Sequence, residues 1–181
     1  VNSIANNNIS ELIVKKIKEL EYQGYQYEAA EASLELIFRE ISGTFSPFFR
    51  ILDSNVQVSY DDAGRGKADA RLKVFVDSEI EHTASDGQGP VDALNKALMK
   101  ALIRFYPELA VVKLKDYKVR VLNEQAGTSA KVRVIIENTD GKLSWSTVGV
   151  SENIIEASRQ ALSDSLNYKL AVLNEKKTKS N

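Results

Sequence analysis

Hydrophobic residues in the first 50 positions recur at the spacing of one face of an α-helix. One stripe consists of Leu12, Ile13, Ile17 and Leu20, and the next consists of Ala30, Leu34, Ile37 and Ile41. Ser10 is a candidate N-cap for the first helix, and Gly24 is a candidate end. We predict one helix from Ser10 to Gly24, a second from about Tyr25 to Ile41, and a connector over residues 45–49.

After Val56 the period changes to two, which is the spacing of one face of a β-strand. Residues 56–60 and 68–76 alternate between apolar and polar, and the glycine-rich stretch 61–66 between them is a hairpin turn candidate. Residues 79–83 are a candidate third strand, and a helical pattern follows over 91–105. The sequence therefore predicts three strands and one helix.

The same order then recurs. Strands are predicted over 117–122, 129–138 and 143–150, and a helix over 151–170. When residues 82–98 are aligned with 146–162, Thr83 meets Thr147, Ala93 meets Ala157, and Ala97 meets Ala161; ARLKVFV (70–76) is matched with AKVRVII (130–136).

One three-stranded sheet with one helix leaves a sheet face bare, so two such units are expected to share a core. The predicted fold class is α+β: two pseudo-symmetric βββα units sharing a core, preceded by an α-helical linker subdomain. The predicted bounds are 1–50 for the linker subdomain, 51–175 for the next domain (units 51–110 and 111–172), and 176–181 for a disordered tail.

Composition narrows the chemistry. The 181 residues carry 24 basic and 25 acidic side chains, no cysteine and one histidine. A net charge of −1 argues against nucleic acid as a partner, and thiolate or histidine-rich metal sites are excluded. No apolar run approaches the roughly 20 residues of a membrane span, and the polar first residues, VNSIANNNIS, lack the apolar core of a signal peptide. We therefore expect a cytoplasmic protein. Val1 is not an initiator methionine, as expected of a piece of a longer chain.

The turn at residues 85–90 is the strongest candidate site. Gly87 and Gly89 allow close backbone approach, and Pro90 fits a first helical position, where free N–H groups favour an anion. A phosphate ligand is disfavoured for two reasons. The turn has no P-loop lysine, and Ala93 stands where a dinucleotide-binding pattern needs its third glycine. A purely structural cap and a site for a carboxylate or other small polar group both stay open. The aligned segment 150–153 of the second copy has a capping serine and no glycine. The turn at residues 85–90 is therefore the better candidate for a ligand site.

Other residues give no catalytic set. Asp61 and Asp62 lie in a hairpin turn, where carboxylates are usually solvated. His82 ends a strand without a neighbouring serine, so a hydrolytic triad has little support. Tyr117 at a strand start and the lone Trp145 are most simply explained as packing residues.

Three segments carry a family resemblance. GYQYEAAEASLELI (24–37), EHTASDGQGPVDALNKAL (81–98), and DYKVRVL (116–122) with GTSAKVRVIIE (127–137) and WSTVGVSENIIEAS (145–158) form this set. The set resembles the C-terminal part of the 2-isopropylmalate synthase and citramalate synthase family, and the first segment favours citramalate synthase. The resemblance implies the linker and the allosteric, dimerising domain of an acyltransferase that condenses acetyl-CoA with a 2-oxo acid. The catalytic TIM barrel and its divalent metal are expected in a missing segment, and no cofactor is expected here.

The resemblance also implies a branched-chain amino acid as feedback inhibitor, isoleucine for citramalate synthase and leucine for 2-isopropylmalate synthase. The effector-binding positions that carry over are Gly87, Gln88, Gly89, Val91, Asp92, Leu114, Tyr117, Val121, Thr128 and Ala130. Amides at the helix start are expected to bind the effector's carboxylate, Asp92 or a carbonyl its ammonium, and Leu114, Val121 and Ala130 its aliphatic side chain.

Alternative functions stay open at this point. A free-standing amino-acid sensor without an attached enzyme is the main alternative from another class, whereas an RNA-binding module is disfavoured by the balanced charge and by strands without a pair of stacking aromatics. In the favoured hypothesis, a homodimer responds to the effector, and the linker helices around residues 10–41 transmit the response to the catalytic barrels.

Overall fold

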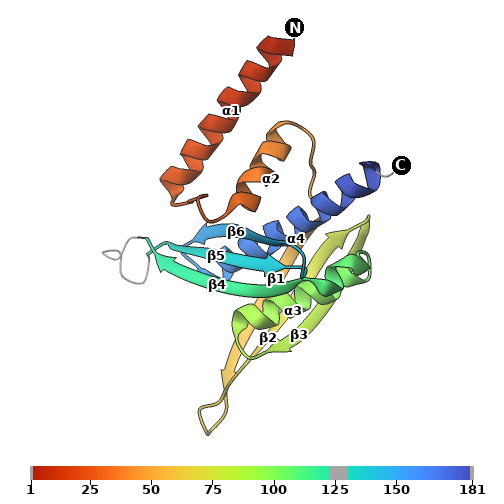
Figure 1. The fold of residues 1–181 in the computed structure, drawn as a ribbon. Helices are drawn as coiled ribbons and strands as arrows, with labels where there is room; N and C mark the ends of the chain where they lie inside the picture. Colours follow the sequence, from red (N-terminus) through yellow and green to blue (C-terminus); the bar gives the residue numbers. More distant parts are fainter. Residues whose placement is uncertain (1, 123–129, 180–181) are drawn as a thin grey trace. The chain divides into compact units, whose positions relative to one another are not determined.

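The computed structural model describes residues 2–122 and 130–179 of the chain. The chain forms two compact units, of which one comprises residues 47–113 and the other residues 1–46 together with 114–181 (Figure 1). We call residues 47–113 the first repeat, residues 114–181 the second repeat, and residues 1–46 the linker.

In the first repeat, three antiparallel strands in the order β1-β2-β3 carry one helix. The elements are β1 (Phe49–Tyr60), β2 (Gly66–Val76), β3 (Glu79–Gly87), α3 (Pro90–Ile103) and the 3₁₀ helix η1 (Pro107–Val111). Alternate residues of β2 are buried, among them Leu72 and Val74. The stripe of α3 that includes Leu94 and Leu98 is buried as well, because α3 covers one face of the sheet (Figure 1).

The second repeat has the same order of elements. They are β4 (Lys113–Val121), β5 (Val132–Thr139), β6 (Ser144–Ser151) and α4 (Ile154–Lys179), with the sheet order β4-β5-β6. The α+β fold with two βββα units is therefore confirmed. A single core shared by both repeats and the predicted domain bounds stay predictions. The last helix runs to Lys179 rather than ending at residue 170, so residues 176–179 of the expected disordered tail lie in a helix. For Ser180 and Asn181, which lie outside the described residues, disorder stays a prediction.

The repeat alignment over the last strand and helix has a direct counterpart in the hydrogen bonds. The buried Thr83 hydroxyl donates to the carbonyl of Ala97 at 2.8 Å, and the buried Thr147 hydroxyl donates to the carbonyl of Ala161 at 2.7 Å. Each bond ties the last strand of a repeat to its helix.

The match of residues 70–76 with 130–136 is wrong in register. Leu72 lies opposite Thr83, whereas Ile136 lies opposite Thr147, so Leu72 corresponds to Ile136. Similar letters misled the alignment, because any two strands with apolar residues at every second position also match when one is shifted by an even number of residues.

The linker consists of α1 (Asn2–Gln23), a connection over residues 24–30, and α2 (Glu31–Ile41). It packs on the face of the second sheet that α4 leaves open, in a cluster that includes Tyr27, Ala30, Val148 and Val150 (Figure 1). The Ser33 hydroxyl accepts a hydrogen bond from the Val148 amide at 3.0 Å. Because β6 is an edge strand, this bond satisfies an amide that would otherwise have no partner in the sheet.

The sequence explains why this face is covered. Beside Thr147, Val148 pairs with Ile135, and Ile135 packs against the linker cluster. Beside Thr83, the corresponding pair is Ala84 with Arg71, and both are exposed. The second sheet is therefore apolar on both faces, whereas the first sheet carries a charged side chain at this position of its outer face.

Three predicted boundaries are corrected. The first helix begins at Asn2 rather than Ser10, and the second begins at Glu31 rather than Tyr25. Gly24 ends α1 in the left-handed region with φ +109°. The Tyr25 amide then donates to the carbonyl of Leu20 at 3.0 Å, which closes a Schellman turn. The strand β1 begins at Phe49, where a connector was expected, because Phe49 pairs with Val76.

In the described ranges 2–122 and 130–179, no helix is long and apolar enough to cross a membrane.

Candidate functional site

The predicted effector residues fall into two groups, one in each compact unit. Gly87, Gln88, Gly89, Val91 and Asp92 lie at the junction of β3 and α3, and Leu114, Tyr117, Val121 and Ala130 lie on or next to the second sheet. Thr128 lies outside the described residues. Each group is described by itself.

The two glycines of the β3–α3 turn serve different purposes. A Cβ atom at Gly87 would lie 2.3 Å from the backbone nitrogen of Ala93, so the end of β3 approaches α3 more closely than any side chain allows. At Gly89 a Cβ atom would meet no heavy atom within 4 Å, and its backbone is extended with φ −154°. Gly87 is therefore required by packing, whereas the space beside Gly89 is open.

Gly89 is also the N-cap of α3, and no side chain caps this helix start. Pro90 follows at the first helical position and has no N–H group to satisfy. In the second repeat, the Oδ1 atom of the aligned residue Asn153 accepts from the amide of Ile155 at 2.8 Å and so caps its helix. The backbone amides at the α3 start therefore lack the side-chain acceptor that Asn153 gives the α4 start, and they are available to an external anion beside the first-turn carboxylate of Asp92.

Asp92 closes the turn. Its Oδ2 atom accepts from the Gln88 amide at 2.9 Å and from the Lys96 ammonium at 2.7 Å. The hydrogen bond from Lys96, followed by the one from the Gln88 amide, lowers the pKa of this carboxyl. Asp92 is thus ionised, but an effector ammonium would have to compete with Lys96 for Oδ2.

In the second group, the strand alternation separates the predicted residues. Tyr117 and Val121 are an even number of positions apart on β4 and share a face, whereas Leu114 belongs to the opposite face. Val121 is 45% exposed, and Ala130 is buried. The structure therefore groups Tyr117 with Val121 but does not group Leu114 with them.

The Tyr117 hydroxyl already has a partner. It lies 2.9 Å from the Ser158 hydroxyl, which itself donates to the carbonyl of Ile154 at 2.6 Å. Because the Ser158 proton is directed to Ile154, Tyr117 is the donor of the pair. Tyr117 therefore offers a ligand its ring edge and a lone pair of its oxygen rather than a free O–H.

Sequence reasoning missed one exposed neighbour. Val119 stands between Tyr117 and Val121 on the same face of β4 and is 41% exposed. A count of every second residue from Tyr117 finds it, because side chains alternate strictly along a strand.

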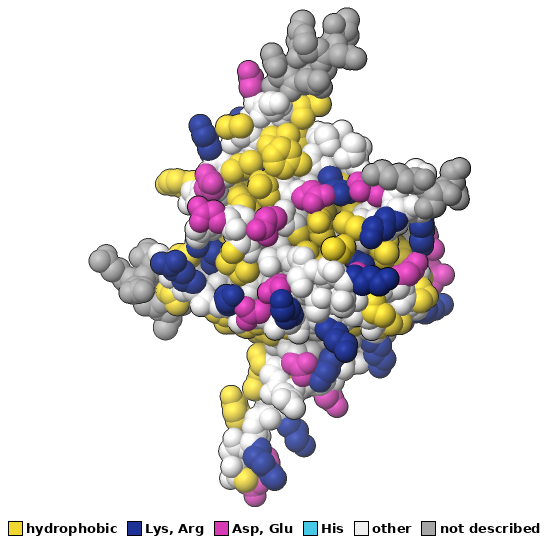
Figure 2. Space-filling view, in the orientation of Figure 1, with side chains coloured by type: hydrophobic (Ala, Val, Ile, Leu, Met, Phe, Trp, Pro, Cys, Tyr) yellow, Lys and Arg dark blue, Asp and Glu magenta, His cyan; other side chains and the backbone are white. Residues whose placement is uncertain are grey.

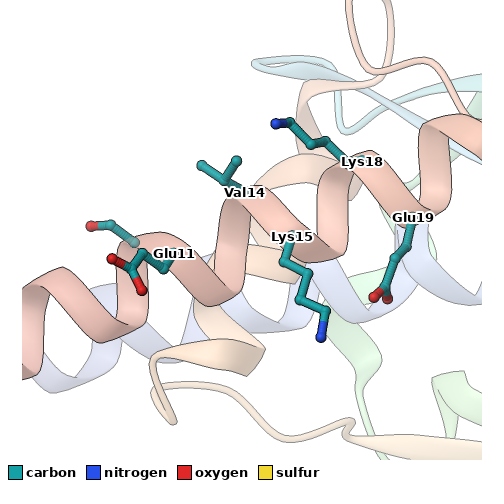
Figure 3. Close-up of a pocket in the computed structure, with 6 residues that line it drawn as sticks. Glu11, Val14, Lys15, Lys18 and Glu19 are labelled. Carbon is teal, nitrogen blue, oxygen red and sulfur yellow. The ribbon is translucent and has the colours of Figure 1, made fainter.

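Surface hollows in the described part of the unit that comprises residues 1–46 and 114–181 lie away from the predicted residues. A hollow of about 560 Å³ lies along α1 and is lined by Ser10, Glu11, Val14, Lys15, Lys18 and Glu19. Figure 3 labels the last five of these side chains on that helix. A smaller one of about 90 Å³ lies beside Trp145, Tyr168 and Lys169. Basic and acidic side chains are interspersed over the face in Figure 2, so no broad basic field for nucleic acid lies there.

Comparisons with known proteins agree with the family resemblance of the sequence. The family model of the LeuA allosteric (dimerisation) domain matches residues 28–170. The chain is 53% identical over 159 residues to an (R)-citramalate synthase of Aquifex aeolicus and 50% identical over 160 residues to one of Geobacter sulfurreducens. Each match covers 87% of this chain but 30% of the relative.

A 2-isopropylmalate synthase of Methanocaldococcus jannaschii is more distant, with 29% identity over 159 residues; the match covers 88% of this chain and 29% of that protein. The chain therefore spans less than a third of the length of these curated relatives.

Proposed function

The chain belongs to the LeuA allosteric (dimerisation) domain family, and from this premise we propose that it regulates an acyltransferase of the citramalate synthase type by binding isoleucine as a feedback inhibitor. The parent enzyme condenses acetyl-CoA with a 2-oxo acid. In this proposal the chain forms a homodimer and supplies the effector site.

The uncapped start of α3 is the observation that carries the effector proposal. The two repeats share one pattern, yet the helix start of the second is capped by Asn153 and that of the first is not. An α-carboxylate placed beside Gly89 takes the role that the Asn153 side chain has in the second repeat. The open space at Gly89 leaves room for it.

Isoleucine is favoured over leucine because the curated citramalate synthases are 53% and 50% identical to this chain, against 29% for the 2-isopropylmalate synthase. The two amino acids differ only in methyl placement, which is worth about 1–3 kcal/mol, so leucine is the alternative effector.

Titration calorimetry of the 181-residue chain with isoleucine, leucine and valine tests the proposal. Isoleucine is expected to bind most tightly, and a Gly89→Asp variant is expected to lose this binding. Aspartate is a good N-cap, so its carboxylate satisfies the α3 amides without disturbing the fold and leaves none for the effector. The matched control is Asn55→Asp, which adds the same charge on β1 of the first repeat, at an exposed position.

The outcomes separate the possibilities. Unchanged isoleucine affinity in Gly89→Asp would place the effector elsewhere, and tighter leucine binding would replace isoleucine as the effector. If none of the three amino acids binds the native chain, the feedback role is wrong. Sedimentation equilibrium tests the homodimer independently.

A further inference from the structure

Tyr27 places an unpartnered hydroxyl under the linker. It lies in the connection over residues 24–30, is 8% exposed, and packs in the cluster with Ala30, Val148 and Val150. Among the described residues, its oxygen is the one buried side-chain polar atom without a hydrogen-bond partner. A buried hydroxyl in this state costs free energy.

Asp164 of α4 is half-buried, acts electrostatically on this phenol and is also unpaired in the described residues. The other acidic side chains of α4 both have partners, since Glu156 pairs with Arg159 and Glu175 pairs with Arg39. Asp164 has no hydrogen bond or ion pair within the described ranges, and its charge acts on both Tyr25 and Tyr27. Tyr25 stacks on Tyr27 with 6.2 Å between ring centroids and donates to the Gln160 side chain at 3.0 Å, one helical turn before Asp164.

The groups that face Asp164 cannot balance a negative charge. The carboxylate of α2 that acts on Asp164 is Glu40, and the phenols of the connection are Tyr25 and Tyr27. The cations of the neighbouring elements are directed elsewhere: Arg39 of α2 pairs with Glu35 and Glu175, and Arg133 of β5 donates to the Gly24 carbonyl and to the Gln26 side chain. The strand β6 carries no titratable side chain. On α4 itself, Glu156 adds to the negative charge around Tyr25. Burial, followed by the repulsion from Glu40, raises the pKa of Asp164 from 3.8 to about 7.

We propose that the packing of linker residues 24–41 on α4 is a proton-linked latch: the closed form holds Asp164 as a neutral acid, and ionisation of Asp164 loosens these residues. The latch lies within one compact unit and does not depend on the identity of the effector. It gives the linker a closed and a loosened state, which a regulatory domain needs in order to send a signal.

The direction of the pH effect follows from the raised pKa. When the linker is open, Asp164 is solvated and titrates near its ordinary value of 3.8; when the linker is closed, it titrates at about 7. Between these values the closed form holds more protons than the open form, so closure weakens as pH rises. Above about pH 7 no further change is expected, because Asp164 is ionised in both forms.

Two measurements on the 181-residue chain test the latch. Carbon-13 NMR of labelled aspartate carboxyls should show one group that titrates near neutral pH and disappears in Asp164→Asn. Hydrogen exchange, expressed as protection factors, should show residues 24–41 losing at least about tenfold protection between about pH 5.5 and about pH 8.5. Residues 90–103, which belong to the other compact unit, are the internal reference and should not change.

Variants sharpen the test. Asp164→Asn should keep residues 24–41 protected at both pH values, and Glu40→Gln should move the transition to lower pH by removing the repulsion. The matched control Asp53→Asn, at an exposed position of β1, should behave like the native chain. The latch is wrong if no aspartate titrates above about pH 5.5, or if Asp164→Asn retains the native pH dependence. If Asp164→Asn does not fold, the latch is tested by the aspartate titration of the native chain and by the shift of the transition in Glu40→Gln.

Discussion

The hydroxyl of Thr147 on β6 donates a hydrogen bond to the carbonyl of Ala161 on α4 at 2.7 Å, and both residues are buried. Thr83 and Ala97 repeat this bond at 2.8 Å in the first repeat. A hydrogen bond from a strand side chain to a helix carbonyl specifies the position of the helix relative to the strand. Apolar packing alone specifies this position less closely.

Replacing Thr147 by valine keeps the branched shape and removes the donor, so we expect the free energy of unfolding to fall by about 1 kcal/mol. Urea unfolding with an unchanged slope measures the loss. The control is Thr178→Val, whose exposed hydroxyl donates to the carbonyl of Asn174 within α4 at 3.0 Å. Equal effects of the two substitutions would show that the Thr147 bond adds nothing to stability.

Both repeats were recognisable in the sequence because the packing of one helix on one strand demands small residues at fixed positions. Ala93 and Ala157 lie where the helix meets its sheet, and both are fully buried. The register of β2 against β5 could not be recognised, because alternation specifies which face a residue takes but not its partner. The correct register appears only when Leu72 is found opposite Thr83.

The candidate site was predicted only in part, because the sequence shows local signals but not which residues become neighbours in the fold. The glycines of the β3–α3 turn are a local signal, and the structure gives each of them a distinct role. Leu114 was grouped with Val121 through the family resemblance, although strand alternation alone places them on opposite faces. Asp164 gave no signal at all, because its lack of a partner depends on how the linker folds back over α4.

The two glycines of the turn predict opposite outcomes for one substitution. Gly87→Ser forces a Cβ atom into the Ala93 backbone, which lies 2.3 Å away. This overpacking should lower the free energy of unfolding by about 1–3 kcal/mol. Gly89→Ser enters open space and adds the missing cap, so stability should stay equal or rise by a few tenths of a kcal/mol. Thermal unfolding of both variants beside the native chain checks the contrast, and equal losses would mean that the backbone approach at Gly87 is looser than the structure shows.

The Lys169–Asp140 pair in the second repeat predicts a strong effect from a single neutralisation. The two side chains are 7% and 10% exposed and lie 2.5 Å apart, and the Lys169 ammonium also lies 5.6 Å from the centre of the Trp145 ring. The hydrogen bond from Lys169, followed by those from the Leu143 and Lys142 amides, holds the pKa of Asp140 far below its ordinary value. Asp140→Asn leaves the ammonium buried without a counter-ion, which typically costs about 3–5 kcal/mol. Urea unfolding of the variant beside the native chain measures this loss.

The matched control for Asp140→Asn is Asp116→Asn. The Asp116 carboxylate pairs with the Lys118 ammonium at 2.6 Å, but both side chains are exposed to solvent, at 41% and 73%. Water and salt screen such a pair, so its loss should change stability little.

The pH dependence of stability adds a second readout for the same two variants. Because the folded-state pKa of Asp140 is lowered, its contribution is complete above its ordinary value of 3.8 and is lost as pH falls below that value. Asp140→Asn should therefore flatten the acid limb of the stability curve, whereas Asp116→Asn should leave most of it in place. An unchanged acid limb in Asp140→Asn would show that this pair does not stabilise the fold.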